Sequence, residues 1–145
     1  MKIKEMAIDP VKFEQGAWIS DIPEMGELKL KVRGIGNSDY RKMQTRLIEA
    51  EPRQYKVGGR LTPERQDFVQ SQCMLHTVLI DWDGLRDEHD APIPYSVDLA
   101  RDLLTKPEYR RFRDAVAWAA SVVGDDVALD GEEAGKSLET PSAGT

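Results

Sequence analysis

The order of apolar and polar residues changes its period near Gly36. From Glu27 to Arg33 the two kinds alternate strictly, with basic residues between leucines and a valine. A period of two is typical of a β-strand with one face on a core and the other in water. A short apolar segment, residues 17–20, comes before it, and turn residues (DIPEMG) lie between the two. The pattern therefore predicts a β-hairpin over residues 17–35.

After this hairpin, apolar residues recur every three or four positions, as they do in amphipathic helices. The spacing predicts helices over residues 38–50, 63–82, 97–104 and 106–123, with a turn at VGGRL, residues 57–61. Helix-capping residues precede these segments: Asn37 or Ser38, Thr62 before Pro63, Ser96, and Thr105 in a capping box with Glu108. The side chains expected on the buried faces are Tyr40, Met43, Leu47, Ala50, Phe68, Leu75, Val78, Leu79, Trp82, Leu99, Ala100, Leu103, Leu104, Tyr109, Phe112, Val116, Ala119 and Val123.

These elements predict an α+β fold that is mostly α-helical. Because two strands alone are only marginally stable, the N-terminal β-hairpin must pack against about four helices. We expect one globular domain over residues 14–124 and an N-terminal arm over residues 1–13. Residues 125–145 hold six acids, one lysine and no apolar period. Such a segment cannot bury enough surface to offset its ordering entropy, so the pattern predicts a disordered acidic C-terminal tail.

Charge narrows the choice of partner. The formal net charge is -6, with 13 basic against 11 acidic residues in 1–70 and 7 against 15 in 71–145. This balance argues against a nucleic-acid partner. The single cysteine, Cys73, excludes an internal disulfide and a cysteine-rich zinc site. No stretch has the roughly 20 apolar residues of a bilayer span or the core of a signal peptide. We therefore expect a cytoplasmic protein that has no membrane partner.

The most acidic stretch, residues 81–90, raises the question of a metal site. A calcium-binding EF-hand loop needs an oxygen ligand at its fifth position, where counting from Asp81 gives Leu85. The stretch is better interpreted as a connector held by apolar packing of Trp82, Leu85 and Tyr95. We therefore predict no metal and no cofactor here.

A second candidate for chemistry is a pair on one predicted helix. Cys73 and His76 lie three residues apart, within reach of each other. A catalytic pair also needs an orienting group and an oxyanion site, and the sequence points to neither. We therefore predict no catalytic residue, and expect Cys73 to be a small buried side chain.

One helical segment is more apolar than a single buried stripe requires. Residues 115–123 read AVAWAASVV and contain no charge. Trp118 and Val122 fall beside the main stripe, and Ala115 begins the run. A helix that is apolar nearly all round is buried on more than one face. The segment is either a central core helix or a surface for another chain, with Ala115, Trp118 and Val122 as candidate protein-binding residues.

A second candidate surface is basic. Arg33 on the predicted strand and Arg41 on the following helix lie near Lys42 and Arg46 in the sequence. These residues form either a solvated face or a contact for an acidic protein partner. Arg33 and Arg41 are therefore also candidate protein-binding residues.

The order of motifs over residues 14–123 resembles that of the tail assembly chaperones of long-tailed bacteriophages. The motifs are EQGAWI, a strand, RGIGNSDYRKM, and a segment running from VLIDWDGL to PIPYSVDLARDLLTKPEYRRF. The tryptophan–glycine–leucine turn and the proline-tyrosine-serine entry to a helix carry most of the resemblance. One position departs from it, because Asp90 stands where the family pattern has glycine.

The resemblance implies a non-enzymatic role in the host cytoplasm. Such chaperones coat the tape measure protein during tail assembly, help to recruit tail tube protein, and are absent from the finished virion. Self-association is a further possibility, and in that family a longer form often arises by translational frameshifting. Two other classes stay open: a structural virion protein, such as a tail or head–tail connector subunit, and a small enzyme or metal protein built on residues 81–90.

Overall fold

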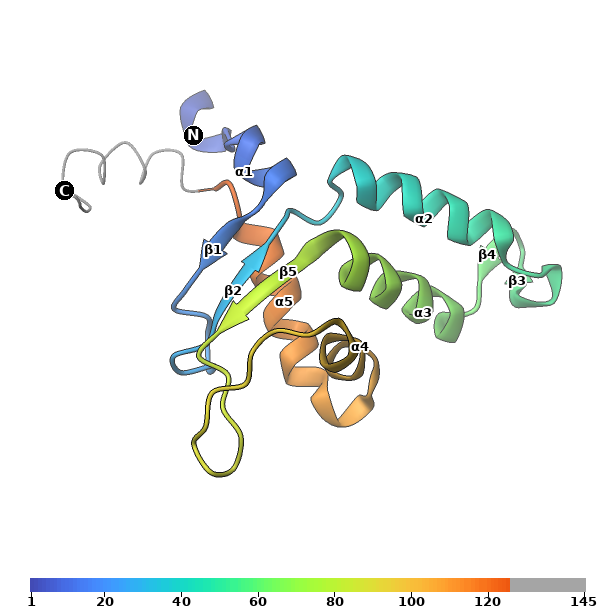
Figure 1. The fold of residues 1–145 in the computed structure, drawn as a ribbon. Helices are drawn as coiled ribbons and strands as arrows, with labels where there is room; N and C mark the ends of the chain where they lie inside the picture. Colours follow the sequence, from blue (N-terminus) through green and yellow to red (C-terminus); the bar gives the residue numbers. More distant parts are fainter. Residues whose placement is uncertain (126–145) are drawn as a thin grey trace.

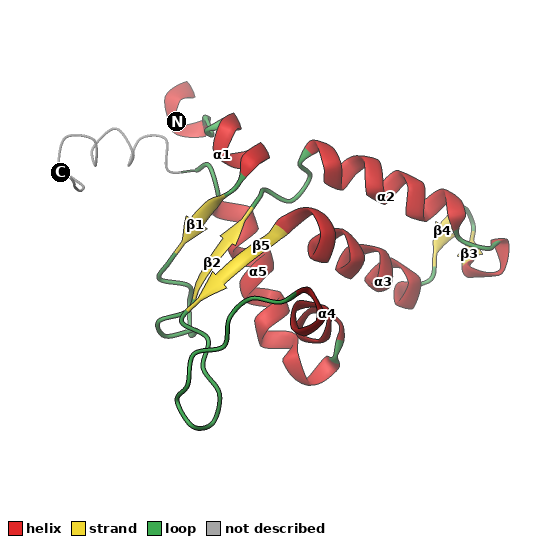
Figure 2. Ribbon diagram, in the orientation of Figure 1, coloured by secondary structure: helices red, strands yellow, loops and turns green. Residues whose placement is uncertain are grey.

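The computed structural model describes residues 1–125 and has an α+β fold that is mostly helical (Figures 1 and 2). The predicted disordered tail lies almost entirely outside the described residues. The helices are α1 (Pro10–Gln15), α2 (Ser38–Ala50), α3 (Pro63–Cys73), α4 (Val97–Thr105) and α5 (Arg110–Val122). The strands are β1 (Ala17–Ile19), β2 (Lys29–Val32), β3 (Lys56–Val57), β4 (Arg60–Leu61) and β5 (Leu79–Asp83).

The main sheet is antiparallel, with the strand order β1-β2-β5. Strands β1 and β2 pair with Ala17 opposite Val32, which confirms the predicted hairpin. Helix α5 lies behind this sheet in Figure 1. On the covered face Leu30 and Val32 are fully buried, whereas Lys29 is exposed and Lys31, between the two buried residues, is half-buried. The alternation of the sequence therefore does separate a core face from an outer face.

The predicted helix over residues 63–82 is wrong beyond Val78. After Cys73 the helix continues as a π-helical turn, Met74–Val78, which leads directly into strand β5. Strand β5 pairs with β2, with Trp82 opposite Leu30. The physical reason is the second edge of β2, which a hairpin with β1 alone leaves unpaired. Val78, Leu79 and Trp82 are buried as expected, but Leu79 and Trp82 lie on strand β5 and Val78 directly precedes it.

Asn37 fixes the start of α2 and the π-helical turn together. Its side-chain oxygen accepts a hydrogen bond from the backbone N–H of Tyr40 at 2.8 Å, which confirms it as the helix cap. Its side-chain amide donates to the carbonyls of Gly34 at 2.9 Å and Thr77 at 2.8 Å. Asn37 is itself fully buried. One side chain therefore ties the end of the hairpin, a helix start and the approach to β5.

Helices α2 and α3 form a hairpin that projects from the body of the molecule (Figure 1). Its tip is the predicted turn, where β3 and β4 pair around Gly58 and Gly59. Two residues expected to be buried, Ala50 and Phe68, are exposed on this projection. The guanidinium of Arg65 lies 4.3 Å from the centre of the Phe68 ring, so the ring packs under a cation.

The C-terminal helices follow the prediction with two corrections. Ser96 caps α4 by accepting a hydrogen bond from the N–H of Leu99. The predicted capping box at Thr105 is wrong: this residue ends α4, and its hydroxyl donates to the carbonyl of Arg101 at 2.6 Å. A short 3-10 turn, Pro107–Tyr109, then separates α4 from α5. Tyr109, expected to be buried, is exposed, because it lies in this turn, before α5 begins at Arg110.

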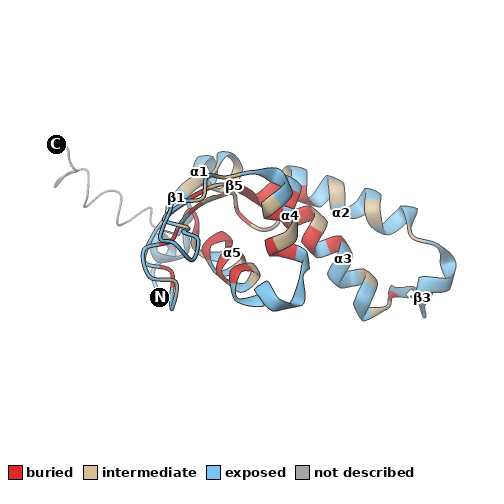
Figure 3. Cartoon of the chain, turned by 60° about the horizontal axis from the view of Figure 1, so that its bottom comes forward, coloured by how far each residue is buried: buried red, intermediate tan, exposed pale blue. Residues whose placement is uncertain are grey.

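The core lies between the sheet and the inner faces of α3, α4 and α5. Figure 3 shows buried residues along these faces, and exposed residues at the tip formed by β3. Backbone hydrogen bonds attach the N-terminal residues to the rest of the fold at two points. The N–H of Asp9 donates to the carbonyl of Gly124 at 2.8 Å, and the N–H of Gly34 donates to the carbonyl of Phe13 at 2.9 Å. Only glycine fits at position 34, because a Cβ there would overlap the Phe13 ring.

Candidate functional site

Helix α5 presents two different faces. Its inner face carries Phe112, Ala115, Val116, Ala119 and Ala120, all buried against the sheet and α4. Its outer face carries polar and charged residues together with one tryptophan. The absence of charge over residues 115–123 therefore serves the core on one side, and leaves Trp118 as an exposed apolar side chain on the other.

Trp118 is the main apolar residue of that outer face. It is 37% exposed, although tryptophan is among the side chains that lose most by contact with water. Val122, one turn further along the helix, is half-buried. The structure thus answers the question left by the sequence: α5 is a core helix, and it also keeps an apolar side chain at the surface.

A groove of about 270 Å³ lies beside Trp118. One wall is the connection between β1 and β2, and the other is α5. The lining residues are Ile22, Pro23, Glu24, Met25, Arg111, Asp114, Ala115 and Trp118. We call this the Trp118 groove. Its floor is apolar and its rim is charged, which is the arrangement found at protein–protein contacts.

The connecting loop is shaped by backbone turns that the sequence marks only in part. Asp21, Glu24 and Gly26 all adopt positive φ angles. Between them the N–H of Met25 donates to the carbonyl of Ile22 at 3.1 Å. Ile22 is thereby buried against the core, while Pro23 stays exposed at the groove. In the sequence, two apolar residues around a proline in a hairpin turn are the only sign of this wall.

The structure brings two of the five candidate residues together. Trp118 and Ala115 both line the groove, with Ala115 buried at its floor. Val122 lies outside its lining. Arg33 directly follows β2 and Arg41 lies on α2, and neither lines the groove.

Ion pairs largely occupy Arg33. Its Nε donates to the backbone carbonyl of Glu14 at 2.5 Å, and its Nη2 lies 2.8 Å from a carboxylate oxygen of Asp39. The Glu14 carboxylate accepts a hydrogen bond from the hydroxyl of Ser38 at 2.8 Å. This bond, helped by the backbone N–H of Ser38 and the charge of Arg33, lowers the pKa of Glu14 below its usual 4.5. Arg33 therefore joins the N-terminal segment to α2, while Arg41 is exposed.

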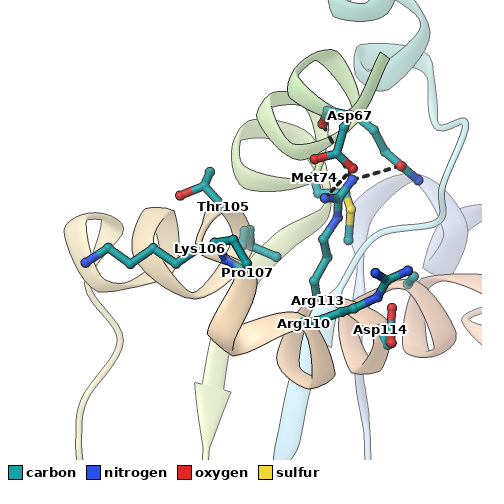
Figure 4. A pocket seen from close by; sticks show the side chains of 11 residues that line it. Asp67, Met74, Thr105, Lys106, Pro107, Arg110, Arg113 and Asp114 are labelled. Carbon is teal, nitrogen blue, oxygen red and sulfur yellow. Dashed lines mark hydrogen bonds and ion pairs between the residues drawn. The ribbon is translucent and has the colours of Figure 1, made fainter. Parts of the chain in front are cut away.

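A second, more polar hollow of about 330 Å³ lies between α3, α4 and α5 (Figure 4). In Figure 4 Arg113 reaches from α5 toward Asp67 on α3, where the two side chains meet at 2.7 Å. Arg113 also donates to the side-chain oxygen of Gln70 at 2.9 Å. Its charge is thus committed to holding two helices together. We assign this hollow a role in packing α3 against α5.

The acidic stretch 81–90 is part strand and part loop. The carboxylate of Asp87 accepts hydrogen bonds from the backbone N–H groups of His89 at 2.8 Å and Ala91 at 3.0 Å. Arg86 pairs with Asp90 at 3.2 Å. These contacts form a turn that returns the chain toward α4. Among residues 1–125 no group of three or more His, Cys, Asp or Glu side chains is placed to hold a metal ion.

The remaining candidate for chemistry is Cys73. It is fully buried, and its burial raises the pKa of the thiol above its ordinary value. His76 is exposed. A raised pKa disfavours the thiolate, which is the reactive form of cysteine. Cys73 therefore acts as a small core side chain, as expected.

A small α+β domain with an apolar groove beside a core helix is the class of molecule that the fold and surface define. Its sequence is phage-derived. The family model described as YdaY prophage protein matches residues 35–136, and the chain belongs to this family. No curated protein and no solved structure matches the chain significantly. Among the residues that the structure describes, no helix is long and apolar enough to cross a bilayer.

Proposed function

We propose that this prophage-family protein is a non-enzymatic tail assembly chaperone acting in the host cytoplasm. It would bind the tape measure protein and help to recruit tail tube protein, and would be absent from the finished virion. The resemblance of residues 14–123 to such chaperones and the membership of a prophage family support this proposal. The observation that carries it is the Trp118 groove, an apolar surface that the domain's own core does not use.

The groove suits an apolar segment of another protein. Trp118 offers a rigid ring, and Pro23 and Met25 offer apolar contacts from the opposite wall. A side chain inserted between them would leave water without losing hydrogen bonds. The charges of Glu24, Asp114 and Arg111 at the rim remain able to contact polar groups of the partner. Buried tryptophans surrounded by such rims dominate the energies of many protein–protein interfaces.

The test is binding of the purified protein to the tape measure protein of the phage or prophage that encodes it. Trp118→Asp should weaken this binding at least about thirtyfold, because truncating an anchor residue typically costs about 2 kcal/mol or more. Trp18→Asp is the matched control. Trp18 is 47% exposed and lies on β1, on the sheet face that α5 does not cover, so its replacement should leave binding unchanged. Circular dichroism should show that both variants remain folded.

Two results would contradict the proposal. If the wild-type chain fails to bind tape measure protein, or if Trp118→Asp binds as tightly as Trp18→Asp, the groove is not the contact. If mass spectrometry of purified particles finds the protein at stoichiometric amounts, it is a structural virion protein instead.

A further inference from the structure

The first eleven residues expose an unusual amount of apolar surface. Five large side chains here are between 41% and 95% exposed: Met1, Ile3, Met6, Ile8 and Val11. Large contiguous apolar patches on a folded protein mark interaction sites. The core of the protein does not use these side chains, although the chain continues past them into well-packed structure.

The exposed segment is anchored to the fold at Asp9, and residues 1–8 extend from this anchor. Asp9 caps α1 by accepting a hydrogen bond from the N–H of Val11 at 3.0 Å, and its own N–H is bonded to Gly124. Residues 10–15 then run as α1 to the sheet. Residues 1–8, the outer part of the expected N-terminal segment 1–13, extend beyond this anchor and form only one short 3-10 turn, Ile3–Met6. From here on, the arm means these eight residues.

The arm and the Trp118 groove are complementary in charge, and both carry apolar side chains. The arm is apolar and carries two lysines against one glutamate. The groove is apolar at its floor, and the acids Glu24 and Asp114 at its rim outnumber Arg111. Asp21, in the same loop, adds a further negative charge, while the charge of Glu27 is paired with Arg86 at 3.7 Å. An arm of net positive charge therefore fits a groove of net negative charge.

We propose that the arm of one chain docks in the Trp118 groove of a second copy of this chain. In the structure no arm residue lines the groove of its own chain, so the groove is open to the arm of a second copy. In the second copy, the apolar arm side chains cover Trp118 and the wall formed by Pro23 and Met25. Lys2 and Lys4 then lie near the acidic rim.

The expected assembly is weak and reversible. Eight arm residues and eight lining residues on each copy fall below the 20–30 residues a side of a standard stable interface. Reciprocal exchange of arms between two copies would engage all of them at once. The inference does not depend on the identity of any phage partner. A partner that uses the same groove would compete with the arm.

Site-directed cross-linking provides the first test. Met6→Cys in one copy and Pro23→Cys in another should form a disulfide-linked dimer when the two variants are mixed under mild oxidation. The native Cys73 does not interfere, because it is buried. Arg46→Cys, on the projecting hairpin, replaces Pro23→Cys as the control and should give no cross-link with Met6→Cys. If the doubly substituted chain instead forms an internal disulfide as a monomer and the mixture does not cross-link, the second copy is excluded.

A mixing experiment provides the second test, by analytical ultracentrifugation over a wide concentration range. Met6→Asp leaves the groove intact, and Trp118→Asp leaves the arm intact. Each alone should weaken self-association at least about thirtyfold. An equal mixture should recover part of the association, because one intact arm meets one intact groove, whereas the wild-type pair makes two such contacts. Unchanged self-association in either variant, or no recovery in the mixture, would overturn the inference.

The two proposals can fail separately. Met6→Asp alters only the arm, so it should still bind the tape measure protein. If it binds that protein while the wild-type chain shows no self-association, the arm inference fails and the proposed function stands. If self-association behaves as expected and no tape measure binding is found, the reverse holds.

Discussion

Replacing Trp82 by alanine tests how the sheet, the acidic connector and α5 are held together. Trp82 is only 4% exposed. Its ring packs edge-to-face on Tyr95, with centroids 4.9 Å apart, and on Phe112 at 5.9 Å. Its indole N–H donates to the carbonyl of Ile93 at 2.8 Å. One side chain therefore joins β5 to the connector and to α5.

The structure sets the size of the effect. Truncating a buried tryptophan or phenylalanine to alanine costs about 3–5 kcal/mol. Each aromatic pair is worth roughly 0.5–1.5 kcal/mol beyond its buried area. With two such pairs and a hydrogen bond lost, Trp82→Ala should cost about 5 kcal/mol. Trp82→Phe keeps most of the ring and loses the bond to Ile93, so it should cost about 2 kcal/mol.

The assay is urea unfolding followed by circular dichroism, which does not depend on the tryptophan removed. With a slope of about 2 kcal/mol per molar urea, Trp82→Ala should lower the midpoint by about 2.5 M. The melting temperature should fall by roughly 10–20 °C. Trp18→Ala is the control, because its ring lies on the open face of the sheet and its loss should cost less than about 1 kcal/mol. If the two variants lose equal stability, the packing role derived for Trp82 is wrong.

Three further predictions concern the polar contacts. Asn37→Ala removes three hydrogen bonds and leaves the carbonyls of Gly34 and Thr77 without this donor. Urea unfolding should therefore show that the free energy of unfolding falls by about 3 kcal/mol. A fall of less than about 1 kcal/mol would contradict the role of Asn37. Because folding lowers the pKa of Glu14, its ionised carboxylate stabilises the fold at pH values above the pKa of the unfolded chain, near 4.5. This contribution is lost as the pH falls through the lower pKa of the folded chain. Glu14→Gln should therefore flatten the decline of melting temperature below pH 4.5, and an unchanged pH profile would refute the assignment. Asp83→Asn combined with His89→Ala should leave stability nearly unchanged, and added Ca²⁺ or Zn²⁺ should not raise the wild-type melting temperature; a saturable rise of several degrees would show a metal site.

The error over residues 79–82 shows where sequence periodicity loses its power. Leu75, Val78, Leu79 and Trp82 fit helical spacing, but the run is also short, apolar and rich in branched residues, as buried strands are. Spacing alone cannot separate these cases. The choice is made by β2, whose second edge needs a partner that lies about 50 positions away in the sequence. Pairing at that distance leaves no local pattern.

The sequence predicts only one wall of the Trp118 groove, the wall formed by α5. The uncharged run of α5 indicates that Trp118 has no place in the single buried stripe, and the structure shows it exposed. The opposite wall depends on how the loop from Ile22 to Met25 folds over α5. That path is set by positive φ angles at Asp21 and Glu24, residues for which such a conformation is uncommon. Similarly, Asn37 was predicted as a cap, but its bond to Thr77 depends on a π-helical turn that the sequence does not reveal.

The projecting hairpin of α2 and α3 has a consequence for hydrogen exchange. Tyr40 is the only buried residue of α2, and the buried residues of α3 are Val69, Ser71 and Cys73, so burial is confined to the end of the hairpin that joins the body. Local opening requires less free energy where fewer apolar contacts are broken. Amide protons near Gly58 should therefore exchange within the shortest times, and those near Cys73 only when the whole domain unfolds. The hairpin can thus open and close from its tip while the sheet and α5 remain intact.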